Sequence, residues 1–166
     1  MNTQFETANA GNAAGTHTWL TPPELLAKLG TFDVDPCAAP NQPWRTATTQ
    51  YTEVDDGLAH TWHGRVWCNP PYGKYSATWL RRCAEHGNAT ALVFARTETK
   101  AFHDYVWPHA HTLLFIKGRL SFRLASGGEA GTAGAPSVLI AYDQTNADIL
   151  RASRIPGAIV QLKGLK

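Results

Sequence analysis

The sequence predicts an α/β fold, a three-layer sandwich whose sheet is mostly parallel and has an antiparallel hairpin at one edge. Short apolar runs alternate with stretches of helical period through the middle of the chain, which is typical of strand–helix–strand units. A glycine-rich segment at 125–135 then separates two further apolar runs, as expected of a hairpin. The 166 residues, 43% of them hydrophobic and 17% charged, suit one domain with a substantial core.

The N-terminal part is expected to hold a flexible arm and then a capped helix. Residues 1–16 are rich in Asn, Ala, Gly and Thr without an apolar period, which predicts an arm ahead of a single domain at 17–166. Thr21 is a favourable N-cap, and Glu24 completes a capping box with it. Gly30 is expected to end this helix, whose apolar face consists of Leu25, Leu26 and Leu29.

The remaining elements follow from the spacing of the apolar residues. Strands are expected at 31–35, 46–51, 64–68, 90–95, 112–117, 120–124, 136–142 and 158–162. Helices are expected at 75–85, 99–107 and 147–153. The glycine-rich segment at 125–135 is interpreted as a loop that connects the hairpin strands and could contact a substrate.

Charge is distributed unevenly, although the net charge is only +2. The first 60 residues contain two basic and seven acidic residues, a balance of −5, whereas the rest contains 13 basic and six acidic residues, a balance of +7. A basic half of this kind suits a polyanionic partner. Uneven surface charge without any partner is the alternative interpretation.

The sequence gives no sign of a membrane or an oxidising compartment. No apolar stretch approaches the roughly 20 residues that span a bilayer, and the N-terminus lacks the regions of a signal peptide. We therefore expect a cytoplasmic protein with no membrane partner. Three cysteines lie in no CxxC spacing and are expected to be reduced, mostly buried thiols: Cys37, Cys68 and Cys83.

The most informative motif is Asn69-Pro70-Pro71-Tyr72, directly behind the apolar run at 66–68. Two consecutive prolines after a buried strand form a rigid turn, because each has a fixed φ and no N–H. In open α/β sheets, ligands bind at the ends of such strands. The motif matches the catalytic motif of S-adenosylmethionine-dependent enzymes that methylate an amino nitrogen, usually N6 of adenine. An ordinary turn is the alternative interpretation.

The motif residues fit this chemistry. The lone pair of adenine N6 is delocalised into the ring, and two acceptors directed at its N–H bonds would release it for attack. Asn69 Oδ1 and the Pro70 carbonyl are the natural pair, and Pro71 keeps the turn rigid. Tyr72 can stack on the target base, which must be flipped out of the duplex to reach the pocket.

Further segments resemble the compact bacteriophage-type DNA N6-adenine methyltransferases. The resemblance implies a Rossmann-like class I methyltransferase fold and, if the protein is encoded by a phage, a place in the host cytoplasm. The resemblance runs from about Thr18 to Tyr142 and includes six segments: 18–24, 32–39, 55–58 with Trp62, 67–73, 115–122 and 135–140. One departure concerns the cofactor loop, usually Asp-Pro-x-x-Gly-x-Gly, in which Ala38, Ala39 and Pro40 replace the glycines.

The resemblance implies roles for individual residues. S-adenosylmethionine is the expected methyl donor, without a metal. Asp35 would take its amino group, and Thr21 and Pro22 would flank its carboxylate. The implied donor-binding set also includes Pro36, Cys37, Ala38, Asn69 and one acidic residue, Asp55 or Asp56, with Asp56 preferred. The expected contacts to DNA are Tyr72, Lys74, Arg119 and Arg123.

Two other functions stay open. The same tetrapeptide occurs in enzymes that methylate glutamine side chains in proteins, and an RNA adenine is a related substrate. A catalytically inactive binding module with the same fold is the second alternative. The basic second half favours DNA over protein, and the intact Asn69 and Tyr72 argue against an inactive module.

Overall fold

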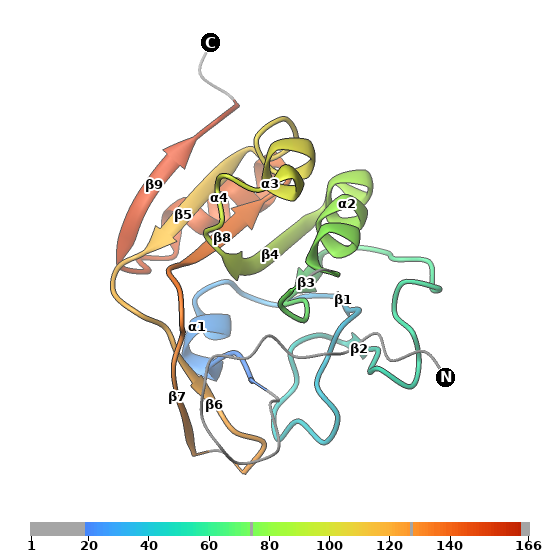
Figure 1. Ribbon diagram of the computed structural model, residues 1–166. Helices are drawn as coiled ribbons and strands as arrows, with labels where there is room; N and C mark the ends of the chain where they lie inside the picture. Colours follow the sequence, from blue (N-terminus) through green and yellow to red (C-terminus); the bar gives the residue numbers. More distant parts are fainter. Residues whose placement is uncertain (1–18, 74, 127, 164–166) are drawn as a thin grey trace.

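A seven-stranded sheet forms the centre of the fold (Figure 1). The computed structural model describes residues 19–163 except 74 and 127. In spatial order the strands are β2 (Thr49–Gln50), β1 (Val34–Asp35), β3 (Val66–Cys68), β4 (Ala89–Phe94), β8 (Ser137–Ala141), β5 (Thr112–Ile116) and β9 (Gly157–Gln161). Two more, β6 (Ser121–Arg123) and β7 (Glu129–Thr132), form a separate antiparallel hairpin. The helices are α1 (Pro23–Ala27), α2 (Ser76–His86), α3 (Lys100–Tyr105) and α4 (Gln144–Ala152).

Five strands of the large sheet, β1 to β5, run in one direction, and β8 and β9 run against them. The predicted α/β class with a mainly parallel sheet is therefore confirmed. The antiparallel part is wider than an edge hairpin, because β8 lies between β4 and β5. Its register with β4 extends from Thr90 opposite Ala141 to Phe94 opposite Ser137.

Hydrophobic cores on both faces of the sheet make the three layers. Side chains of a strand alternate between its faces, and β4 illustrates the result: Ala91 and Val93 pack beneath α2 and α3, whereas Leu92 packs beneath α1 and α4. Among the described residues no helix is long and apolar enough to cross a bilayer.

Two local predictions at the hairpin and at α1 are wrong. The expected loop at 125–135 contains β7, which the pattern did not reveal because its four residues have no apolar alternation. The capping box is not formed, since Pro22 is the N-cap of α1 and no side chain bonds there. Thr21 and Glu24 instead contact distant residues, Asn69 and Arg123 respectively. Gly30 follows the helix with a φ of 78°, as expected of a terminating glycine.

The order of the strands places the carboxyl ends of β1 and β3 side by side. From β1 the chain passes to β2 on one side and later returns to β3 on the other. This reversal is a switch point, where the carboxyl ends of neighbouring parallel strands leave a crevice. Asp35 ends β1 and Asn69 follows β3, so both lie at that crevice.

Candidate active site

A cavity of about 30 Å³ lies at the crevice between the ends of β1 and β3. Its lining includes five residues expected to contact the donor, namely Thr21, Asp35, Cys37, Ala38 and Asn69. Such a volume holds about two water molecules, far less than a nucleoside-sized donor. The cavity therefore has room for one end of such a donor.

Asp35 is a buried carboxylate with neutral partners. Its side chain is 3% exposed. Oδ1 accepts the Cys37 N–H at 3.0 Å, and Oδ2 accepts the Thr46 hydroxyl. Burial raises the pKa of this carboxyl from 3.8 to about 6, against the lowering effect of the two hydrogen bonds. A cation beside Asp35 would restore the charged form.

Only one end of the Asn69 side-chain amide, the nitrogen, has a described hydrogen-bond partner. Its Nδ2 donates to Thr21 Oγ1 at 3.1 Å. Its Oδ1 is buried and has no hydrogen-bond partner among the described residues. A buried acceptor left in this way costs about 1–3 kcal/mol, so an acceptor kept free here is a sign of function.

Two thiols lie near Asn69, since Cys37 lines the same cavity and Cys68 precedes Asn69 in the chain. The sulfur atoms of Cys37 and Cys68 are 3.8 Å apart, and all three cysteines are free, as predicted. Burial raises the pKa of the Cys37 thiol to about 11. Both groups therefore stay neutral near pH 7 and act as packing beneath the crevice.

Tyr72 lies in an aromatic cluster next to a second, larger cavity. Its ring stacks on Phe94 with centroids 3.9 Å apart and planes 2° apart, and meets the edge of Phe122 at 6.3 Å. The hydroxyl is buried without a described partner, and burial raises its pKa. The neighbouring cavity, about 610 Å³, is lined by Tyr72 and Phe94 and also by Arg96 and Lys100.

The sequence interpretation did not include Phe94, Arg96 or Lys100. A signal was available, because Phe94 ends β4 at the same edge of the sheet at which Asn69 follows β3. The rule that ligands bind at the carboxyl ends of parallel strands applies to both.

A comparison with protein families decides the class of this site. The model of the DNA N-6-adenine-methyltransferase (Dam) family matches residues 11–156. The chain belongs to this family. Membership indicates DNA adenine methyltransferase activity, with DNA as substrate and S-adenosylmethionine as the general donor of such enzymes. No curated protein and no solved structure matches the chain. The narrower bacteriophage-type grouping stays a prediction.

In this Dam-family chain, the two candidate acidic residues differ in their surroundings. The Asp55 carboxylate accepts the N–H and the hydroxyl of Thr52, both at 2.8 Å, and these bonds lower its pKa. Asp56 is exposed and has a φ of 51°. Gly57 lets this turn pack against the backbone at Pro36, since a Cβ at Gly57 would lie 1.8 Å from the Pro36 oxygen. Asp55 thus closes the turn, whereas the Asp56 side chain faces solvent.

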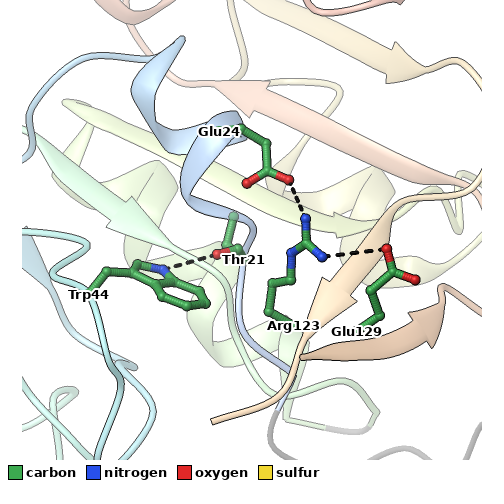
Figure 2. A network of polar contacts seen from close by, with 5 residues as sticks. All are labelled: Thr21, Glu24, Trp44, Arg123 and Glu129. Atoms are coloured by element: carbon green, nitrogen blue, oxygen red, sulfur yellow. Dashed lines mark hydrogen bonds and ion pairs between the residues drawn. The ribbon is translucent and has the colours of Figure 1, made fainter. Parts of the chain in front are cut away.

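The residues expected to contact DNA lie in different settings. Lys74 lies outside the described residues. Arg119 is exposed in the turn between β5 and β6. Arg123 is engaged within the fold of this methyltransferase, because its guanidinium lies 2.8 Å from Glu24 and 3.5 Å from Glu129 (Figure 2). A phosphate at Arg123 would therefore compete with two carboxylates.

In the described part of the chain, no group of three or more His, Cys, Asp or Glu side chains could hold a metal ion. The expectation of metal-free transfer stays a prediction.

Proposed function

We propose that this protein transfers the methyl group of S-adenosylmethionine to N6 of an adenine flipped out of DNA, and that the transfer takes place at Asn69. The observation that carries the proposal is the buried Asn69 Oδ1, an acceptor without a described partner at the switch point of the sheet. An acceptor held ready in this way suits an amine that gains positive charge during reaction.

The lining of the 30 Å³ cavity fits the amino-acid end of the donor. The donor carries an ammonium group, and Asp35 offers a buried carboxylate whose described partners are neutral. Cys37 and Ala38 border the same cavity, as does Thr21, which Pro22 follows. Asp56 is the acidic residue that we assign to the nucleoside part, because Asp55 closes a turn. When bound, the donor supplies an electrophilic methyl group on a sulfonium.

The chain's own groups then act on the target amine. Asn69 Oδ1 and the Pro70 carbonyl accept its two N–H bonds, which draws the nitrogen lone pair out of conjugation with the ring. The nitrogen forms a bond to the methyl carbon as the carbon–sulfur bond breaks. The extra proton on the product amine is acidic and leaves to water, so positioning supplies most of the rate.

The target base would lie against Tyr72. Phe94 covers one face of the Tyr72 ring at van der Waals distance, so we place the base on the opposite face. The cavity of about 610 Å³ beside this pair is large enough for a nucleotide. Arg96 and Lys100 line this cavity and would contact the phosphates of the DNA strand that carries the flipped base. The ion pair of Lys100 with Asp104 is exposed, and such pairs yield readily to other partners.

Labelled donor incubated with unmethylated DNA tests this function. Mass spectrometry of the digested product should show N6-methyladenine with the wild type and strongly reduced amounts with Asn69→Ala. Parallel reactions contain total protein and RNA. Label in a protein glutamine or in RNA, with none in DNA, would replace this proposal by the corresponding alternative. No transfer to any of the three would support the inactive binding module.

A further inference from the structure

Asn69 needs a second group to define which end of its amide faces the substrate. The terminal torsion of asparagine is broad and roughly two-fold, so its oxygen and nitrogen can exchange places. An amide turned the wrong way would direct N–H groups at an amine that also donates. Thr21 provides the contact that can define the orientation. Its Oγ1 accepts from Nδ2 at 3.1 Å, and Oδ1 then has no described partner. Because a hydroxyl can also donate, this orientation is fixed when the hydroxyl hydrogen is donated to another group.

Thr21 is itself held in place by two other segments of the chain. It is 3% exposed. Its carbonyl accepts the Trp44 indole N–H at 3.2 Å (Figure 2). The preceding residue, Leu20, forms two backbone hydrogen bonds with Arg123 of β6, at 2.9 and 3.0 Å. The backbone that carries the hydroxyl is therefore held from two sides.

Arg123 anchors this arrangement from the hairpin side. Its guanidinium bridges Glu24 in α1 and Glu129 in β7, as Figure 2 shows. Exposed ion pairs contribute little to stability on their own. Here they join the hairpin to the segment that carries Thr21, which is a geometric rather than an energetic role.

We propose that Thr21 is a positioning residue, whose hydroxyl orients the Asn69 amide so that Oδ1 faces the amine to be methylated. This inference rests on the proposed function. Thr21 also lines the 30 Å³ cavity, so its hydroxyl hydrogen can be donated to an anionic group there. That donation leaves Oγ1 as an acceptor for Nδ2 and ties the orientation of the amide to occupation of the cavity.

The pair Thr21→Ala and Thr21→Ser tests the proposal, because the two variants differ by the hydroxyl alone. At saturating donor and DNA, Thr21→Ala should lower kcat by about 10-fold to 100-fold, whereas Thr21→Ser should stay within about threefold of the wild type. The proposal is overturned if kcat of Thr21→Ala stays within about twofold, even if donor affinity falls, or if Thr21→Ser is as slow as Thr21→Ala.

A second readout does not depend on activity. In nuclear magnetic resonance spectra of the protein without donor, the Asn69 side-chain amide hydrogens should exchange slowly with solvent in the wild type and in Thr21→Ser. They should exchange at least about 10-fold faster in Thr21→Ala, which lacks the acceptor. Equal exchange in all three proteins would overturn the inference. A wild type that shows this pattern but methylates no DNA would refute the proposed function and leave the contact established.

Discussion

Replacing Asp35 by asparagine should make the protein more stable and a poorer binder of its donor. The substitution removes the charge and keeps the shape of the side chain. The oxygen of the new amide can still accept the Cys37 N–H. Its nitrogen can donate to the Thr46 hydroxyl oxygen, so the contact with Thr46 is kept with the direction of the hydrogen bond reversed. The change thus isolates the effect of a buried negative charge.

The magnitude follows from the pKa of the carboxyl. Burial raises it from 3.8 to about 6, so between these values the native state holds a proton that the unfolded chain has released. The stabilisation is complete below the unfolded pKa and is lost as the pH rises through about 6. The difference in pKa corresponds to about 3 kcal/mol. Asp35→Asn should therefore match the wild type near pH 4 and exceed it by up to about 3 kcal/mol at pH 7.5.

Two measurements check this reasoning. Urea unfolding of both proteins without donor, from about pH 4 to 8, gives the difference in free energy of unfolding, in which the contributions of the histidines cancel. Calorimetry should show donor binding weakened by about 1.5–3 kcal/mol in the variant, from loss of a charge-assisted hydrogen bond. Parallel pH curves would refute the raised pKa, and unchanged donor affinity would remove Asp35 from the donor site.

The other predictions concern the Asn69 amide, the Tyr72 ring and Arg96, which we propose to contact DNA. Asn69→Ala should lower turnover about 10²–10³-fold with little change in donor affinity, measured by label transfer and calorimetry; an active variant would reduce the motif to a turn. Tyr72→Phe should keep activity and raise the free energy of unfolding by about 1 kcal/mol, because it removes a buried hydroxyl without a described partner. Tyr72→Ala should lose base stacking and activity. Equal loss of activity in both variants would contradict the role of the ring. Arg96→Ala should reduce by about one the slope of log affinity for DNA against log salt; the control, Arg81→Ala, removes an arginine paired with Glu85 on α2 and should leave the slope unchanged.

Elements with strong apolar runs were predictable from the sequence. The expected strands at 90–95 and 136–142 agree with β4 and β8 to within one residue at each end, because strands buried on both faces appear as continuous apolar runs. Weakly patterned elements were not. The expected strands at 31–35 and 46–51 shorten to two residues each, and β7 was missed. The pairing of β7 with β6 depends on tertiary contacts that no local pattern encodes.

The candidate site divides in the same way. Asp35 and Asn69 were found because short motifs mark them, and the fold brings them to one cavity. Thr21 illustrates the limit of local reasoning, since its position before two prolines and Glu24 fits an N-cap well. Its hydroxyl oxygen instead accepts a hydrogen bond from Asn69, 48 residues away in the chain. Phe94 and Arg96 were missed because an aromatic residue and a cation at the end of a strand indicate a site only when the neighbouring strand is known. Here that neighbour is β3, which Asn69 follows.

The position of β8 has a consequence for folding while the chain is being synthesised. This strand is buried along its whole length between β4 and β5, yet it follows both of them in the chain. While the ribosome is still producing the segment before Ser137, β4 and β5 each carry an unpaired apolar edge, the type of surface that invites aggregation. β8 therefore joins the two halves of the sheet late, before β9 is added at the edge, and nascent chains that stall before β8 should be targets for chaperones and proteases.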